Sequence, residues 1–372
     1  MSSRMKVGIT GQAGLIGSHL YNFLGLKADI QRIGFDKSCF NDQKALENFV
    51  AQCDVIVHLA AMNRHKDPSV IYDTNVDLVE KLIAACEATK ATPHIIFSSS
   101  TQEEMDNVYG KSKLKGRNAL ENWATKTGAK VAGLVIPNVF GPFGKPYYNS
   151  VVATFCHQLT HGETSTINVD GQLKLIYVNE LIEEIYKNIV EGNEGKIAVK
   201  HSKEIKVSEI LALLNSYKAD YFDKGIFPSL EDPFEKALFN TYRCYIPYDH
   251  YPFHLKKNTD NRGTFVEIAR ANTSGQFSFS TTHTGITRGN HFHTRKAERF
   301  AVIQGKALIQ LRKVDSNEVI DYYLDGDAPS FVDMPIWYTH NIKNIGEEDL
   351  ITLFWINEPY NQEDPDTYFV NV

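Results

Sequence analysis

The chain has 372 residues, of which 42% are hydrophobic and 23% are charged. This length exceeds the roughly 100–200 residues of one ordinary domain, so we expect two domains, each with its own core. The net charge of −6 offers no basic surface to a nucleic acid, and no run reaches the ~18 apolar residues that span a bilayer, so we expect neither nucleic-acid nor membrane partners.

The start of the chain, residues 1–9, leads directly into an apolar run, without the charged and then apolar leader of a secreted protein. The five cysteines are widely spaced and include no Cys-x-x-Cys pair. This pattern is typical of reduced thiols in the cytosol, so we expect a cytoplasmic protein.

Up to about residue 243, short apolar runs alternate with longer amphipathic stretches. The former predict strands and the latter predict helices. The expected strands are residues 6–10, 29–35, 55–60, 94–98 and 130–136, and the expected helices include residues 15–24, 69–88 and 112–127. Strands that are apolar on both faces indicate a parallel sheet with helices on both sides. We therefore expect a doubly wound α/β fold of the Rossmann type in a first domain, residues 1–245.

The turn between the first strand and the first helix carries three glycines, Gly11, Gly14 and Gly17. This spacing permits a tight turn and a close approach of the backbone to a pyrophosphate, whose charge the helix N-terminus stabilises. The sequence therefore predicts a dinucleotide cofactor here. The residues expected to bind it are Gly11, Gly14, Leu15, Ile16 and Gly17.

The second expected strand ends at Asp36 and Lys37, about where a residue that reads the cofactor's ribose should lie. Asp36 would accept a hydrogen bond from a 2′-hydroxyl, whereas Arg32 or Lys37 would favour a 2′-phosphate, so NADH and NADPH both remain open. The third strand contains His58, which either packs in the core or takes part in the chemistry. Its exit loop is expected to contact the cofactor through Leu59, Ala60 and Ala61.

Tyr109 and Lys113 are four residues apart on an expected helix, so they share one face. An ammonium beside a phenol lowers the phenol's pKa, which suits proton transfer to a carbonyl oxygen. The serine run 98–100 ends the fourth strand, at the carboxyl edge where ligands of doubly wound sheets bind.

In this order, the glycine turn, the serine run and the Tyr109/Lys113 pair resemble the extended short-chain dehydrogenase/reductase (SDR) family, which includes nucleotide-sugar epimerases and dehydratases. The resemblance covers about residues 5–240 and includes an Asn-x-x-Gly-Pro motif that starts at Asn138. It implies an NAD(P)-binding domain with a substrate-side segment at about 140–245. The arginine often found before this motif is replaced by Ile136 and Pro137, so the residues that contact the substrate's diphosphate stay unresolved.

The resemblance also implies roles for individual residues. Tyr109 would be the acid/base, and Lys113 would tune it and contact the cofactor. Ser100 would donate a hydrogen bond to the substrate oxygen, with Ser99 or Thr101 as alternatives. Ser99 and Asn138 would bind the substrate.

After an aromatic and proline-rich stretch at 244–253, the pattern changes to apolar runs of period two, separated by turn residues. These runs predict the strands 275–280, 299–303, 307–311, 319–324 and 350–356. We therefore expect an all-β second domain, residues 250–372.

A candidate metal site lies in this second half. His291 and His293 alternate onto one face of a strand, Glu298 lies on the returning strand, and His340 follows later. Three imidazoles and one carboxylate can enclose a divalent metal and leave a position for water or substrate. The ligand type favours Zn²⁺, although manganese, iron and nickel bind the same set. The spacing resembles the two cupin motifs, with Trp337 where glycine is usual, and implies a cupin barrel.

An extended SDR domain followed by a cupin resembles, over essentially the whole chain, the CapF-type enzymes of capsular polysaccharide synthesis. The resemblance implies a bifunctional enzyme that acts on a UDP-4-keto-6-deoxy-N-acetylhexosamine. The cupin would epimerise C3, and the SDR domain would then reduce C4 with NADPH. The product would be UDP-2-acetamido-2,6-dideoxy-L-talose, on the route to UDP-N-acetyl-L-fucosamine.

This chemistry is also coherent from first principles. C3 lies next to the ketone, so a metal that polarised the ketone would ease loss and return of the C3 proton. Tyr109 would protonate the C4 oxygen after hydride transfer. The base at the cupin stays open among Tyr338, His283 and Lys296.

Other functions remain possible. The chain could be a single-function nucleotide-sugar reductase whose cupin is structural, a reductase fused to an iron-dependent cupin oxygenase, or a non-catalytic NADP-dependent sensor. The Tyr109/Lys113 pair argues against a sensor, which needs no tuned phenol. The sheet faces and edges of cupin barrels are commonly covered by a partner, so we expect a homodimer.

Overall fold

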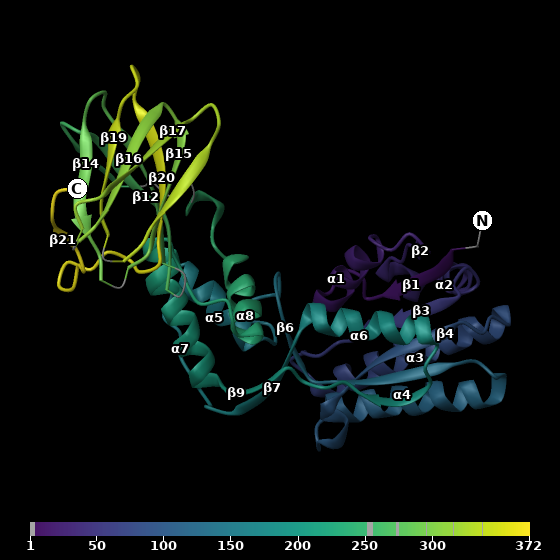
Figure 1. Ribbon diagram of the computed structural model, residues 1–372. Helices are drawn as coiled ribbons and strands as arrows, with labels where there is room; N and C mark the ends of the chain where they lie inside the picture. The colour runs from purple at the N-terminus through teal and green to yellow at the C-terminus, as the bar shows by residue number, and fades with distance from the viewer. Residues whose placement is uncertain (1–3, 251–255, 273–274, 295, 315, 337) are drawn as a thin grey trace. The chain divides into compact units, whose positions relative to one another are not determined.

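The computed structural model describes the whole chain except residues 1–3, 251–255, 273–274, 295, 315 and 337 (Figure 1). By its internal contacts the chain divides into two compact units. The first contains residues up to 215 together with 232–246, and the second contains 216–231 together with 247–372. We did not expect 216–231 to pack with the second unit, because no pattern in that segment marks it as part of a sheet.

A six-stranded parallel sheet forms the centre of the first unit. Its strand order is β2-β1-β3-β4-β5-β8. The strands are β1 (Met5–Thr10), β2 (Ile30–Ile33), β3 (Val55–His58), β4 (His94–Ser100), β5 (Val131–Ile136) and β8 (Gly195–Ala198). The strand order reverses at β1, which lies between β2 and β3. Ligands of open α/β sheets bind at the carboxyl ends of the strands beside such a reversal.

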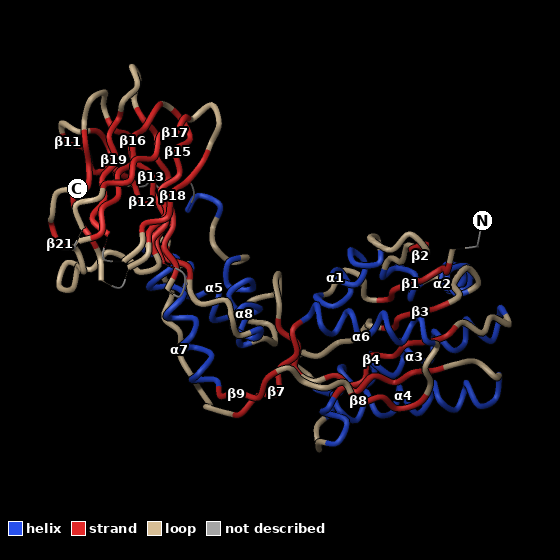
Figure 2. Tube along the Cα trace, viewed as in Figure 1, coloured by secondary structure: helices blue, strands red, loops and turns tan. Residues whose placement is uncertain are grey.

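Helices cover both faces of this sheet (Figures 1 and 2). On one face lie α1 (Leu15–Leu24) and α6 (Val178–Glu191), and on the other lie α2 (Gln43–Val50), α3 (Pro68–Thr89) and α4 (Val108–Thr127). Each face has its own apolar core, because strands such as β3 are buried on both sides. The predicted doubly wound fold is confirmed.

The rest of the first unit is built from smaller elements. A three-stranded sheet contains β6 (Asn138–Phe140), β7 (Gln172–Tyr177) and β9 (Lys203–Lys206). The helices are α5 (Val151–Thr160), α7 (Val207–Tyr217), which runs into the second unit, and α8 (Pro233–Arg243), and the short turns are η1 (Lys37–Asn41) and η2 (Thr101–Glu104). None of the described helices is both long and apolar enough to cross a membrane.

Two largely antiparallel sheets form the second unit, as the sequence predicts. One has the order β10-β12-β13-β20-β15-β18, with β11 paired to β12, and the other has the order β17-β16-β19-β14-β21. The first contains β10 (Ile226–Phe227), β11 (Lys257–Asp260), β12 (Gly263–Ala271), β13 (Gly275–Thr282), β15 (Glu298–Gln304), β18 (Ser330–Met334) and β20 (Leu350–Ile356). The second contains β14 (Thr287–Phe292), β16 (Lys306–Lys313), β17 (Val319–Asp325), β19 (Tyr338–Asn344) and β21 (Tyr368–Phe369).

The two sheets share one apolar core. Its buried side chains include Phe300 and Val302 from β15 and Ile309 and Ile342 from β16 and β19. The segment 216–231, which contains the π-helical turn η3 (Lys218–Phe222), joins this unit because its strand β10 pairs in parallel with β12. A short turn, η4 (Tyr248–His250), precedes the first antiparallel strand.

Candidate active site and metal centre

The glycine turn at the end of β1 has the geometry of a pyrophosphate site. Gly11 has φ +75°, and a Cβ there would lie 2.7 Å from the Ala60 backbone nitrogen. A Cβ on Gly17 would lie 2.2 Å from the Gly11 carbonyl oxygen. Gly14 precedes α1 and supplies no side-chain cap, so the first N–H groups of the helix, beginning with Leu15 and Ile16, are available to an anion.

The exit loop of β3 lies beside this turn. The Leu59 N–H donates to the Thr10 carbonyl at 3.1 Å, and the Ala60 N–H approaches the Thr10 hydroxyl at 3.4 Å. The next residue, Ala61, is exposed. The structure therefore brings the predicted cofactor-binding residues of β1, α1 and β3 together at the reversal in strand order.

The residues expected to read the ribose differ in where they lie. Asp36 follows β2, and its carboxylate accepts hydrogen bonds from the backbone and hydroxyl of Ser38, which hold its pKa below the usual value. Lys37 begins η1 next to it. Arg32 instead donates to the Tyr21 carbonyl at 2.9 Å, in the C-terminal half of α1. Asp36 and Lys37 thus remain candidates, whereas Arg32 is held away from the glycine turn.

Tyr109 and Lys113 lie in the first turns of α4. This helix begins at Val108, earlier than expected, because Asn107 caps it by accepting a hydrogen bond from the Gly110 N–H at 2.8 Å. The Lys113 side chain is buried, and its Nζ donates to the Ser98 carbonyl at 2.8 Å and lies 5.7 Å from the Tyr109 ring centre.

Burial sets the protonation of this pair. It lowers the pKa of Lys113 to about 7 and raises the pKa of Tyr109 to about 12. The expectation that the ammonium lowers the phenol's pKa is therefore wrong for this structure, because burial and, to a smaller extent, Tyr148 raise that pKa, and Lys113 contributes no lowering. Tyr109 is a neutral phenol at pH 7, which is the form that donates a proton.

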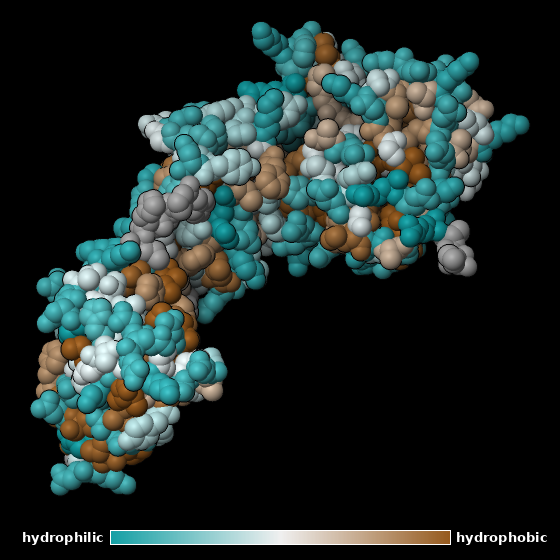
Figure 3. Space-filling model, turned by 90° about the horizontal axis from the view of Figure 1, so that it is seen from above, coloured by the Kyte–Doolittle hydropathy of each residue, from teal (hydrophilic) through white to brown (hydrophobic). Residues whose placement is uncertain are grey.

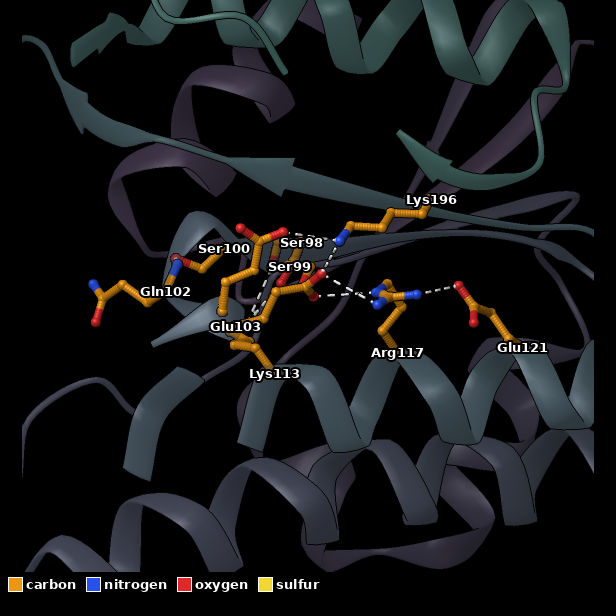
Figure 4. A network of polar contacts seen from close by, with 10 residues as sticks. Ser98, Ser99, Ser100, Gln102, Glu103, Lys113, Arg117, Glu121 and Lys196 are labelled. Atoms are coloured by element: carbon orange, nitrogen blue, oxygen red, sulfur yellow. Dashed lines mark hydrogen bonds and ion pairs between the residues drawn. The ribbon is translucent and has the colours of Figure 1, made fainter. Parts of the chain in front are cut away.

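The three serines of β4 point in alternate directions, as side chains of a strand must. Ser98 donates to the His58 carbonyl at 3.1 Å and lies beside Lys113. Ser99 donates to the Glu103 carboxylate at 2.5 Å (Figure 4). Ser100 accepts a hydrogen bond from Gln102 at 3.2 Å and begins η2. Ser100 therefore shares the Lys113 side of the strand, whereas Ser99 is turned toward Glu103.

A buried ion pair, which sequence reasoning missed, holds the turn after these serines (Figure 4). Both carboxylate oxygens of Glu103 lie 3.1 Å from the Arg117 guanidinium, and Lys196 lies 3.0 Å away. Burial raises the pKa of Glu103, but these partners outweigh it and hold the pKa below its usual value. The one sequence signal was Gly133 in the apolar strand β5, where a Cβ would lie 2.4 Å from Arg117.

Two other predicted residues lie outside this group. His58 is buried, its Nδ1 lies 2.8 Å from the Thr10 hydroxyl, and burial lowers its pKa to about 3, which supports the packing role. Asn138 is exposed at the start of β6, and among the described residues no hydrogen bond joins it to Tyr109 or Ser100.

Four potential metal ligands meet in the second unit, and they are the four that the sequence pattern selects. One donor atom each from His291, His293, Glu298 and His340 lies within 4.8 Å of the others. The Glu298 Oε2 lies 3.2 Å from the His293 Nε2 and 3.1 Å from the His340 Nε2. These three atoms are buried, and apart from the contacts that they make with one another they have no hydrogen-bond partner among the described residues. Such atoms are rare, and their convergence fits a bound cation.

The protonation of the cluster fits a divalent metal at His291 and Glu298 but not at His293. Burial lowers the pKa of His291 to about 4. Burial raises the pKa of Glu298, but the imidazoles of His293 and His340 outweigh it and leave the pKa well below the usual value. A neutral imidazole and an ionised carboxylate are the forms that bind metals. Burial lowers the pKa of His293, but the Glu298 carboxylate outweighs burial and leaves that pKa above its usual value, so a metal would displace a proton there.

A second group of residues orients these ligands. The His293 Nδ1 hydrogen-bonds the Asp366 carbonyl, and the His340 Nδ1 lies 3.2 Å from the Tyr338 carbonyl. Both bonds direct Nε2 toward the centre of the cluster. The Asp366 carboxylate accepts hydrogen bonds from the Thr294 hydroxyl at 2.6 Å and the Lys296 backbone at 3.1 Å. The sequence analysis missed Asp366 because no motif connects it to the histidines. Trp337, which stands where cupins usually have glycine, lies outside the described residues.

Three of the four candidate ligands, His291, His293 and Glu298, line a cavity of about 1200 Å³ whose walls come from both sheets. Of the three candidate bases, only Lys296 lines it. His283 pairs with the exposed Asp349 at 2.9 Å, and Tyr338 contributes its carbonyl to His340.

Comparison with known proteins agrees with both halves of this architecture. Residues 7–199 match the NAD dependent epimerase/dehydratase family. The chain belongs to this family. Residues 258–368 match the polysaccharide biosynthesis C-terminal domain.

Over nearly its whole length the chain is a CapF-like protein. It resembles the crystal structure of the capsular polysaccharide assembling protein CapF from Staphylococcus aureus, with 36% identity, a TM-score of 0.87, and coverage of 99% of this chain and 100% of that one. It is 31% identical to the UDP-2-acetamido-2,6-beta-L-arabino-hexul-4-ose reductase of Pseudomonas aeruginosa over 99% of both chains. The spore coat polysaccharide biosynthesis protein SpsL of Bacillus subtilis is 28% identical over 30% of this chain and 81% of its own.

Proposed function

We propose that this protein is a bifunctional nucleotide-sugar enzyme of capsular polysaccharide synthesis. It epimerises C3 of a UDP-4-keto-6-deoxy-N-acetylhexosamine in the cupin and then reduces C4 with NADPH in the SDR domain. The product is UDP-2-acetamido-2,6-dideoxy-L-talose, a precursor of UDP-N-acetyl-L-fucosamine. The observation that carries the proposal is full-length similarity to a UDP-hexulose reductase in a chain that holds both the Tyr109/Lys113 pair and the His₃Glu cluster.

The reduction takes place at the carboxyl edge of the parallel sheet. Bound NADPH supplies the hydride. The glycine turn holds the pyrophosphate, and Asp36 or Lys37 contacts the ribose. Tyr109, which burial keeps neutral, gives its proton to the C4 oxygen while Ser100 donates a hydrogen bond to the same oxygen. Lys113, anchored on the Ser98 carbonyl, stabilises the phenolate that remains.

The epimerisation takes place in the cupin cavity. A divalent metal held by His291, His293, Glu298 and His340 supplies Lewis acidity toward the C4 ketone, and this ligand set favours Zn²⁺. The C3 proton must leave on one side of the sugar and return on the other. Lys296 is the candidate for the proton transfer on one of these sides, because it is the one proposed base that lines the cavity.

Proton NMR of the keto sugar in deuterated water tests both steps. Deuterium should enter C3 without NADPH, and this exchange should be lost in His291→Ala. Reduction at C4 should then require NADPH and be lost in Tyr109→Phe. Intact reduction without exchange would favour the single-function reductase, and absence of both reactions would favour the sensor.

We further propose that the protein acts in the cytoplasm as a homodimer. Apolar side chains are visible among polar ones on the second unit (Figure 3). Tyr323 on the edge strand β17 is 72% exposed, and Phe331 on the edge strand β18 is 54% exposed. A second copy would cover such edges. Light scattering that gave the mass of a single chain at micromolar concentration would exclude the dimer.

A further inference from the structure

The cupin cavity is electropositive although the chain as a whole is acidic. The residues that line it include two glutamates and six basic residues, which are Lys224, Lys256, Arg262, Arg270, Arg288 and Lys296. Glu298 faces the histidines of the metal cluster, and Glu267 forms a salt bridge with Arg270 at 2.7 Å. Lys224 is paired with Asp220 at 3.5 Å and Arg262 with Asp260 at 2.6 Å. Lys256, Arg288 and Lys296 therefore carry the positive charge that no salt bridge among the described residues balances, and such a cavity attracts anions.

Arg288 lies on β14, the strand that also carries the metal ligand His291. It lies three positions before His291 in β14, and in a regular strand the two side chains would point to opposite faces. A β-bulge between Gly289 and His291 changes this. Gly289 and Asn290 both have positive φ, at 100° and 63°. The extra residue brings Arg288 and His291 to the same wall of the cavity.

The partners of Arg288 on neighbouring β19 fix its distance from the cluster. Arg288 is opposite Ile342, and His291 is opposite His340. These positions on β19 are two residues apart, which corresponds to about 7 Å. The backbone positions that carry the guanidinium and the imidazole are therefore separated by a distance on the scale of one sugar ring.

Arg288 forms no direct salt bridge with a carboxylate among the described residues, although the more distant charge of Asp260 acts on it. Its guanidinium donates to the Thr281 carbonyl at 3.3 Å, which holds it in place and leaves other N–H groups free. Burial and the charge of Arg262 lower its pKa, so its positive charge is poorly compensated. Arg262, in contrast, is bound to Asp260 at 2.6 Å.

We propose that Arg288 binds the diphosphate of the nucleotide sugar in the cupin cavity, so that the hexose lies between Arg288 and the metal cluster. Lys256 and Lys296 add charge to the same cavity. A guanidinium can bind two phosphate oxygens at once, which orients the sugar as well as holding it. This inference rests on the proposed substrate class and assigns the residue that recognises the substrate at the epimerisation site.

The test is phosphorus NMR relaxation of UDP with the full chain carrying Mn²⁺ in the cluster, after free ion has been removed. Relaxation by Mn²⁺ falls steeply with distance, so a strong effect on the phosphorus signals reports UDP bound close to the cluster. The variants are Arg288→Gln and Arg299→Gln, the latter an exposed arginine on β15 that pairs with Asp333. Metal content and melting temperature confirm that each variant is folded and loaded.

We expect Arg288→Gln to weaken the binding of UDP at this site at least about tenfold, which corresponds to ~1.4 kcal/mol. Arg299→Gln should leave the affinity for UDP unchanged. Arg288→Lys should retain part of the binding. Equal relaxation in wild type and Arg288→Gln would overturn the inference.

Deuterium exchange at C3 separates this inference from the proposed function. If wild type exchanges and Arg288→Gln has an unchanged KM for exchange, the inference fails while the epimerase proposal stands. If relaxation depends on Arg288 but wild type does not exchange, the nucleotide site stands and the epimerase proposal fails.

Discussion

The two candidate sites are assembled over very different distances along the chain. In the first unit, Tyr109 and Lys113 share one helix, and Lys113 is anchored on the strand just before it. In the second unit, His293 is oriented by Asp366, 73 positions later. The first site is therefore built mainly from local structure, with its protonation set by burial. The second depends on tertiary contacts that hold a remote segment against the ligands.

The largest expected effect is at the local site. Tyr109→Phe should lower the rate of C4 reduction by about 10²–10⁴-fold, because it removes the proton donor. Exchange of deuterium at C3 should remain as in wild type. Tyr186→Phe, on the opposite face of the sheet, is the control and should reduce normally. Loss of C3 exchange in Tyr109→Phe would show that the two sites are not independent.

The buried ion pair behind the serines should matter for stability. Glu103→Gln leaves Arg117 without its buried partner, so we expect the free energy of unfolding to fall by about 3–5 kcal/mol in urea denaturation. Glu121→Gln removes the more exposed partner of the same arginine and should cost less than about 1 kcal/mol. Similar losses in the two variants would mean that the pair does not hold η2.

The remote support of the metal cluster predicts a graded loss. Asp366→Ala removes the carboxylate that holds the turn between His293 and Glu298, so metal affinity should fall about 10–100-fold in competition with a chelator. Asp349→Ala, which affects only the exposed pair with His283, should bind metal normally. An unchanged affinity in Asp366→Ala would show that the carboxylate is not needed and that the backbone carbonyl of residue 366 is enough to orient His293.

The smallest effect concerns pH. The pKa of Lys113 is lowered to about 7 in the fold and returns to its ordinary value of about 10.4 on unfolding, so unfolding takes up a proton between these values. The contribution of Lys113 to stability therefore increases as pH rises above 7, by up to about 1.4 kcal/mol per unit. This slope should be absent in Lys113→Met. If the free energy of unfolding depended on pH in the same way in wild type and Lys113→Met, Lys113 would have to stay charged in the fold.

Sequence patterns located what depends on spacing within one element or between adjacent ones. Gly11 and Gly17 are required because neighbouring backbone leaves no room for a Cβ. Three of the four metal ligands lie on strands and His293 directly follows β14, so the alternation that selects them is visible in the sequence. The α/β and all-β fold classes could also be predicted, because hydrophobic periodicity is a pattern within single helices and strands.

What the sequence did not reveal depends on the environment that the fold creates. The raised pKa of Tyr109 reflects burial, which no local pattern reports. The Glu103–Arg117 pair and the contact from Asp366 join residues far apart along the chain. Arg32 appeared suited to a 2′-phosphate by position alone, yet the fold holds it on the Tyr21 carbonyl.

The bulge in β14 determines whether Arg288 and His291 face the same cavity, so the proposed anion site and the metal cluster depend on one local feature of the backbone. A Cβ at Gly289 would lie 2.8 Å from the His340 carbonyl oxygen, and its φ of +100° excludes most other residues. Deleting one residue here would retain Arg288 and every metal ligand, yet it would turn the arginine to the outer face of the sheet. A related protein can therefore lose the proposed anion site through a one-residue deletion in β14, although its sequence still contains the arginine and all the metal ligands.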